Sequence, residues 1–281
     1  MDYIQTVING IMLGGIFAIL GVGMTIIFGI VKLTNLAHGE FVIIGAYAST
    51  LLADIIGVDP ILTLIITIPL MFVIGVVLQS VLVNRVMLQG SEPALLVTFG
   101  LSIILQDAML LLFSADAKKA NVPYNSSTIP LPGGLYIPVL DLILLVISLV
   151  TILVLTLFLR RTYMGRAIRA TSDDIVAASL MGVSIKKSYA IAMGIAMATA
   201  AVAGLCVGMR WTFYSSSGSS YLLRAFGVVV IGGMGSIPGA LVGGLVFGLA
   251  QAFGGASYGL LASYIVLIIM LIVRPQGLFS K

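Results

Sequence analysis

Long apolar runs separated by short polar segments dominate the pattern of this 281-residue chain. The runs lie near 4–30, 36–53, 61–83, 94–113, 138–159, 189–209, 226–254 and 257–273. A bilayer core about 30 Å thick needs roughly 20 apolar residues in a helix. The pattern therefore predicts an all-α integral membrane protein with about eight transmembrane passages, the first of them an uncleaved helix.

Two polar interruptions, near 32–40 and 232–239, break this pattern. The run 226–254 is too long for one upright helix and is broken at 235–239, which reads GSIPG. We predict a re-entrant segment there: a half-helix, a turn, and a helix that leaves on the same side. Unwound backbone in a membrane is tolerated where it is buried in protein or lines a cavity, and paired interruptions mark transport pathways. Whether the two segments belong to an internal repeat is left open by the sequence.

Composition excludes a soluble domain. Hydrophobic residues make up 60% of the chain, charged residues 9%, and the mean hydropathy is +1.21, whereas soluble domains are about 25% charged. The pI of 9.2 does not indicate a nucleic-acid partner, because the basic residues form no patch interleaved with aromatic residues. The single cysteine, Cys206, lies in an apolar run and is interpreted as a buried thiol. No metal-ligand spacing is present, so no metal or cofactor is expected on this chain.

The distribution of Lys and Arg predicts the orientation, since cytoplasmic loops are enriched in them. The segment 160–188 carries Arg160, Arg161, Arg166, Arg169, Lys186 and Lys187. If it is cytoplasmic, then Lys32, Arg85, Arg274 and Lys281 also lie inside, and Lys118, Lys119, Arg210 and Arg224 lie outside. The N-terminus is then expected outside and the C-terminus in the cytoplasm.

The candidate pathway residues lie in the two interruptions. They are Asn35, His38, Gly39, Glu40, Gly232, Gly233, Gly235, Ser236, Pro238 and Gly239. A carboxylate at the bilayer centre costs about 2.5–3.5 kcal/mol, so Glu40 with His38 indicates gating or a pathway. Alternatively both lie at the watery interface, or Glu40 favours the N-terminus of the second helix. For Asp107, we favour a helix–helix hydrogen bond over a substrate contact.

The cytoplasmic segment contains the candidate coupling residues. They are Gly165, Arg166, Arg169, Asp173, Asp174, Ala177, Ala178, Ser179 and Gly182. We expect residues 166–182 to form one amphipathic helix along the membrane surface, with Ser172 and Asp173 as cap. Ala178 and Gly182 would lie on its small-residue face. The helix is either merely interfacial or a docking element for a cytosolic partner.

Catalytic signatures are missing from the sequence. There is no phosphate-binding G-x-x-x-x-G-K-[ST] loop and no G-x-S-x-G elbow. We therefore expect a transport subunit rather than an enzyme, with energy supplied by another chain. A stand-alone secondary transporter using Glu40 and Asp107 as ion sites is a rival interpretation, and an intramembrane enzyme is a remote one.

Four segments resemble the permease subunits of bacterial ABC importers for branched-chain amino acids, specifically the shorter, H-type subunit. They read NLAHGE at 35–40, MGRA at 164–167 continuing to ASLMG at 178–182, GGMGSIPGA at 232–240 and RPQGLF at 274–279. One departure concerns the general importer loop motif E-A-A-x3-G. Val176 stands where the Glu is expected before Ala177 and Ala178, although the spacing to Gly182 is kept.

The resemblance implies one permease domain over 1–281, with a coupling loop at 160–188, in the bacterial inner membrane. It implies a second permease (a copy or a paralogue), two cytosolic ATPases that hold ATP and Mg, and a periplasmic or lipid-anchored binding protein. Alternating access would move branched-chain amino acids past 35–40 and 232–239. The same machine carrying urea, short amides or other amino acids is the alternative.

Overall fold

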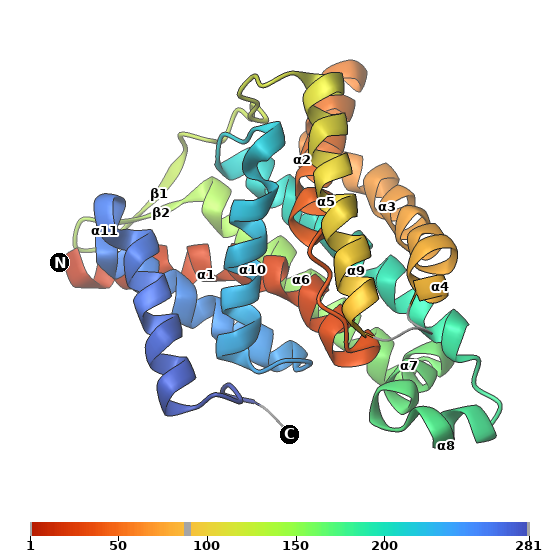
Figure 1. Ribbon diagram of the computed structural model, residues 1–281. Helices are drawn as coiled ribbons and strands as arrows, with labels where there is room; N and C mark the ends of the chain where they lie inside the picture. Colours follow the sequence, from red (N-terminus) through yellow and green to blue (C-terminus); the bar gives the residue numbers. More distant parts are fainter. Residues whose placement is uncertain (1, 87–90, 280–281) are drawn as a thin grey trace.

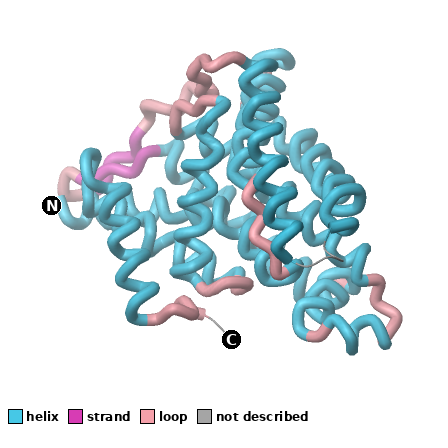
Figure 2. Tube along the Cα trace, viewed as in Figure 1, coloured by secondary structure: helices cyan, strands magenta, loops and turns pink. Residues whose placement is uncertain are grey.

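The computed structural model describes residues 2–86 and 91–279, and helices account for most of them (Figures 1 and 2). The longer helices are α1 (Asp2–Ile26), α2 (His38–Ile56), α3 (Leu64–Leu78), α5 (Ser91–Phe113), α6 (Val139–Arg161), α7 (Tyr163–Asp173), α9 (Ile185–Arg210), α10 (Gly218–Gly232) and α11 (Ile237–Val273). The short elements are α4 (Asn84–Val86), α8 (Ile175–Leu180), π-helical turns at Ile27–Val31 and Gln79–Val83, 3-10 turns at Pro60–Thr63 and Ser215–Ser217, and strands β1 (Thr128–Leu131) and β2 (Leu135–Pro138).

Within the described residues, seven helices are long and apolar enough to cross a membrane. The last of these, α11, has 37 residues but breaks at Gly255, whose φ of 66° and ψ of −166° are not helical. The break divides α11 into two halves of equal length, each about 27 Å long. Counting both halves gives eight membrane-length segments, so the predicted all-α membrane class is confirmed.

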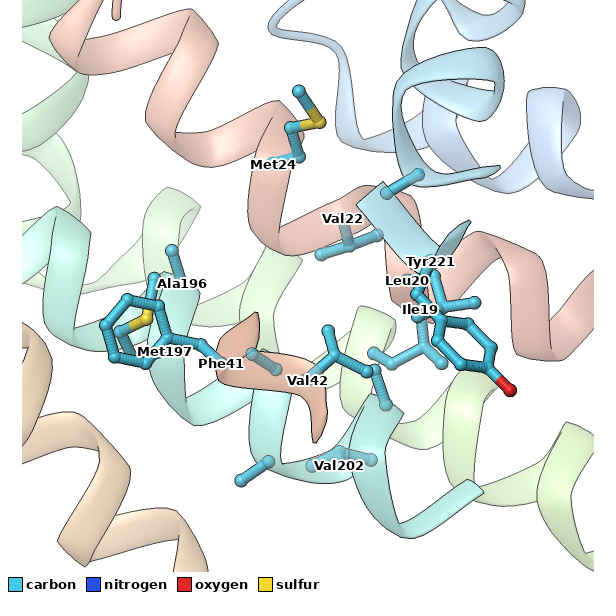
Figure 3. Close-up of a cluster of buried hydrophobic side chains, with 14 of the residues drawn as sticks. Ile19, Leu20, Val22, Met24, Phe41, Val42, Ala196, Met197, Val202 and Tyr221 are labelled. Carbon is cyan, nitrogen blue, oxygen red and sulfur yellow. The ribbon is translucent and has the colours of Figure 1, made fainter. Parts of the chain in front are cut away.

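The centre of the fold is α9, which is buried along almost its whole length. Its many small side chains let other helices approach closely. A Cβ added to Gly204 would collide with the backbone of α2 at Val42 and Ala46, and one on Gly45 would come 2.9 Å from the Ala201 Cα. Figure 3 shows the resulting core, in which side chains from α1, α2, α9 and α10 interdigitate.

Residues 114–138 gather at one end of the molecule, which we call the hairpin end (Figure 1). Strands β1 and β2 pair there in antiparallel register, with Thr128 opposite Pro138. The Tyr124 hydroxyl donates to the Asp59 carboxylate at 2.9 Å. Burial, together with the hydrogen bond to Asp59, raises the pKa of Tyr124, so this hydroxyl stays protonated and ties the loop to the start of α3.

The segment predicted as re-entrant is a helix, a turn and a helix. In Figure 1, α10 descends from the hairpin end, and α11 climbs back before its second half descends toward the C-terminus. The turn occupies 233–236 rather than the expected 235–239. The difference arises because Pro238 is tolerated in the first turn of α11, where the Ser236 hydroxyl accepts a hydrogen bond from the Gly239 N–H at 3.1 Å.

Candidate functional site

The first interruption is an extended, largely buried segment between α1 and α2. Neighbouring side chains accept hydrogen bonds from its backbone N–H groups. The Leu36 N–H donates to the Thr98 hydroxyl of α5 at 3.3 Å, and the Ala37 N–H donates to the Asn35 side-chain oxygen at 3.1 Å. Non-helical backbone persists at membrane depth only with such partners. In this chain, therefore, the segment is held by α5 and by its own Asn35.

His38 lies deep in the packing between α1, α2 and α9. It is 1% exposed, and its Nε2 lies 3.4 Å from the Leu20 carbonyl oxygen. The imidazole fills the space beside Gly23, because a Cβ on Gly23 would come 2.7 Å from the His38 Cε1. Within this chain His38 therefore contacts protein rather than water, and its imidazole packs between α1 and α2.

Glu40 is also 1% exposed, so its side chain likewise contacts protein rather than water. Its carboxylate stands where a Cβ of Gly218 would be, and a Cβ on Gly39 would collide with the Gly218 carbonyl oxygen. A side-chain hydrogen bond joins it to Ser102 of α5, while Oε2 has no hydrogen-bond partner among the described residues. Glu40 therefore lies in the first turn of α2 and against the start of α10, and helix N-termini favour negative charge.

The two interruptions are connected through α10. This helix begins at Gly218, against Glu40, and ends at Gly232, where the second interruption starts. In addition, Gly29, just before the first interruption, packs on Gly235 of the second, with little room for a side chain on either. The two interruptions are therefore linked by backbone packing.

At the second interruption, glycines allow the backbones of α10 and α11 to pack directly against each other. A Cβ on Gly232 would collide with the Gly239 carbonyl group, and a Cβ on Gly239 would collide with that of Gly232. Gly233 and Gly235 have φ angles of 99° and 87°, which side chains disfavour. The C-terminal segment then covers the turn, with the Phe279 N–H donating to the Gly232 carbonyl at 3.0 Å.

The expected coupling helix is in fact two helices. The chain breaks at Asp174, whose carboxylate caps α8 by accepting from the Val176 and Ala177 N–H groups at 2.8 and 3.0 Å. The predicted cap by Ser172 and Asp173 is wrong. Several candidates here are exposed, namely Arg166, Arg169, Asp173, Asp174, Ala177 and Ser179. Gly165 packs against the end of α6, where a Cβ would collide with the backbone.

Of the two residues expected on a small-residue docking face, one is buried and one is exposed. Ala178 is only 4% exposed, whereas Gly182, at the end of α8 with a φ of 80°, is exposed. Large apolar residues are exposed beside them, with Leu180 82% and Met181 84% exposed. Large apolar patches rimmed by polar residues mark interaction sites.

Ser172 has a role that the sequence did not indicate. Its hydroxyl donates a 2.5 Å hydrogen bond to the carbonyl oxygen of Gly29. Because Gly29 packs on Gly235, α7 is joined through two contacts to the turn at 233–236. No local pattern identifies such a bond, since serine is common in exposed helices and its partner lies 143 positions away.

Asp107 makes no hydrogen bond or ion pair that would support the predicted helix–helix bond within the described residues. It is exposed on α5, on a stripe with Leu96, Phe99, Ile103 and Leu111. A carboxylate facing lipid costs roughly 2.5–3.5 kcal/mol near the bilayer centre. The face of α5 that carries Asp107 is therefore expected to meet protein or water rather than lipid.

Residues 6–274 match the family described as branched-chain amino acid transport system / permease component. The chain belongs to this family. The permease is 33% identical to the high-affinity branched-chain amino acid transport system permease protein BraD of Pseudomonas aeruginosa, over 99% of this chain and 96% of that protein. LivH of Escherichia coli (strain K12) is 31% identical over the same shares.

The comparisons also support the H type. LivM of Salmonella typhimurium is 27% identical, and the match spans 94% of this chain but 67% of LivM. Among solved structures, PsaBC from Streptococcus pneumoniae in complex with Fab aligns with a TM-score of 0.51 over 98% of this chain and 93% of that chain, at 14% identity. That likeness concerns the fold alone.

A polar cavity at the hairpin end of the permease was missed by the sequence reasoning. The Arg210 Nε lies 2.6 Å from the Asp141 carboxylate, and the pair lines a cavity of about 580 Å³ together with Trp211 and Gln251. Asp141 begins α6 and Arg210 ends α9. The sequence did carry one signal for this pair. Asp141 and Arg210 have opposite charges and stand at ends of apolar runs that are predicted to lie on the same side of the membrane. The pair ties α6 to α9.

Proposed function

We propose that this permease moves branched-chain amino acids across the bacterial inner membrane by alternating access, driven by ATP hydrolysis on separate chains. Its partners would be a second permease, two cytosolic ATPases that hold ATP and Mg, and a periplasmic or lipid-anchored binding protein. The names of the relatives support the substrate class. The observation that carries the mechanism is a continuous line of contacts from the surface helices to Glu40.

This line begins at α7. The Ser172 hydroxyl holds the Gly29 carbonyl, Gly29 packs on Gly235, and the turn at 233–236 ends α10, whose other end lies against Glu40. Packed backbone transmits displacement because it leaves no compressible space. A partner that pushes on α7 and α8 would thereby shift α10 relative to α2.

The exposed apolar face of α8 is better suited to contact with a cytosolic ATPase than to contact with water. Val176, Leu180 and Met181 are each at least 67% exposed in the isolated chain. The neighbouring helix α7 and the residue before α8 carry the exposed charged candidates Arg166, Arg169, Asp173 and Asp174. An apolar centre with a polar rim is the ordinary anatomy of a protein interface.

The second permease is proposed to cover the exposed stripe of α5. This assignment gives Asp107 a protein or aqueous neighbour in place of lipid. The rival secondary transporter, with Glu40 and Asp107 as ion sites, would need two separate sites, because Glu40 is buried against Gly218 and Asp107 is exposed on α5. Whether the second permease is a copy or a longer paralogue is decided by purifying the complex from its native membrane.

The coupling proposal predicts that Leu180→Ser with Met181→Ser strips the ATPase from the purified permease. Burying each of these side chains stabilises a contact by about 1.5–3 kcal/mol, so their loss should weaken docking more than tenfold. Leucine-stimulated ATP hydrolysis in proteoliposomes containing the binding protein should fall in parallel. Urea and acetamide should not stimulate the unmodified complex.

The matched control is Ile129→Ser, which makes the same kind of change on an exposed strand at the hairpin end. It should keep the ATPase and the stimulated hydrolysis. Full stimulation in the Leu180/Met181 variant would exclude α8 as the coupling element. Stimulation by urea but not by leucine would move the substrate to the alternative class.

The proposed orientation predicts which engineered cysteines react in intact cells. Cys206 is completely buried, and Cys206→Ala removes it as a background. Asn125→Cys, exposed at the hairpin end, should react with an impermeant maleimide in intact cells. Ser179→Cys, exposed on α8, should react only after permeabilisation. The opposite pattern would invert the orientation and remove the basis of the cytosolic docking proposal.

A further inference from the structure

An apolar groove of about 460 Å³ lies between α3 and α6, with α9 as its floor. Its walls include Phe72 of α3, Val154 and Phe158 of α6, and Ile191 and Ile195 of α9. Two threonines also line it, but the Thr151 and Thr199 hydroxyls donate to carbonyl oxygens of their own helices, both at 2.8 Å. Because these hydroxyl groups already donate within their own helices, the surface that the groove presents to an occupant is apolar.

The two helix stripes that form the groove continue into basic residues at one end. On α6, Arg161 follows Phe158 by three positions, and on α9, Lys187 precedes Ile191 by four, so each lies one turn beyond the groove on the same face. Both side chains are exposed. They lie at the same end of the molecule because only α7 and α8 separate the end of α6 from the start of α9 (Figure 1).

We propose that this groove is a binding site for an anionic phospholipid, with an acyl chain in the groove and the phosphate between Arg161 and Lys187. The groove lies on three membrane-length helices, where acyl chains are the surrounding solvent. Basic pockets between membrane helices bind anionic headgroups. The two basic residues thus suit the headgroup of an anionic phospholipid, and the apolar groove suits its acyl chain.

The shape of the groove suits an acyl chain. From Val150 to Phe158, α6 lines the groove over about 12 Å, and a thin flexible chain can lie along this apolar length. A helix of a partner protein is the competing occupant, which the cysteine experiment below distinguishes.

The chain offers matched controls for the headgroup contact. Arg160 and Lys186 are also exposed and adjoin the proposed ligands, but each points about 100° away around its helix. We would measure lipid binding by native mass spectrometry of the full chain, titrated with phosphatidylglycerol or phosphatidylethanolamine. Arg161→Gln with Lys187→Gln should weaken binding of one phosphatidylglycerol about thirtyfold, and Arg160→Gln with Lys186→Gln should change it less than about threefold.

The groove itself is tested with Ala198→Phe, which fills its floor. This variant should lose phosphatidylglycerol while keeping its helical circular dichroism spectrum. The proposal is overturned if the two charge variants weaken binding equally, or if phosphatidylethanolamine binds as tightly as phosphatidylglycerol. It is also overturned if Val154→Cys forms disulfides with a second protein chain in native membranes, since the groove is then a protein interface.

Discussion

Gly239→Val should prevent the permease from reaching a stable fold in the membrane. The first carbon of any side chain at 239 would collide with the carbonyl group of Gly232, which belongs to the last turn of α10. The backbone cannot retreat, because Gly243 packs as closely on the Val228 carbonyl one turn away. Overpacking typically costs 1–3 kcal/mol, and more where backbone is displaced, so the yield of monodisperse protein and its Tm in detergent should both fall sharply.

Gly100→Val provides the control for this prediction. Gly100 lies within α5, and a Cβ there would meet nothing within 4 Å. The same change in volume should therefore leave yield and Tm near those of the unmodified chain. Equal losses for the two variants would show that valine is simply disfavoured in these helices, and a normal Gly239→Val protein would show that the α10–α11 turn is looser than its contacts imply.

The membrane segments were predictable because lipid imposes one requirement on every residue that faces it. Apolar runs of sufficient length identified the spans, and the break near Pro238 was visible as a cluster of glycines within an apolar run. Such patterns are local, and the helices follow from them. The exact position of the turn was not predictable, because Pro238 fits either a turn or the first turn of a helix.

The candidate site was only partly predictable, because its central contacts join residues far apart in the sequence. Glu40 stood out as a carboxylate beside an apolar run, but its contact with Gly218 depends on the packing of α2 against α10. The cap of α8 shows a different difficulty. Ser172, Asp173 and Asp174 all suit a helix N-cap, and the structure assigns that role to Asp174 and gives Ser172 a bond to Gly29.

The burial of Ala178, which was expected on the docking face, has a related cause. Alanine and glycine are compatible with either side of a helix, so their spacing carries little information about which side faces outward. The exposed residues of this region, Leu180 and Met181, would be expected inside a soluble helix. In a chain that works with partner proteins, exposed apolar residues mark the places where the isolated chain is incomplete.

Glu40→Gln should lower leucine uptake about tenfold at an unchanged level of protein in the membrane. Glutamine keeps the shape, so the packing against Gly39 and Gly218 is preserved. It removes the carboxyl group, which can carry a negative charge, from the first turn of α2 and the start of α10. Such interactions contribute up to about 2 kcal/mol in partly buried sites, and 1.4 kcal/mol corresponds to a tenfold change.

The comparison that isolates this effect is Asp54→Asn, the same chemical change at the exposed far end of α2. It should leave uptake within about twofold of normal, since an exposed charge is screened by water and salt. Glu40→Gln should also weaken coupling: basal ATP hydrolysis persists because the α8 face is intact, but leucine stimulates it less because the electrostatic interaction of Glu40 with the start of α10 is lost while the packing remains. Normal uptake and stimulation in Glu40→Gln would reduce Glu40 to a residue that only favours a helix terminus, and would remove it from the line of contacts that joins α7 to the pathway.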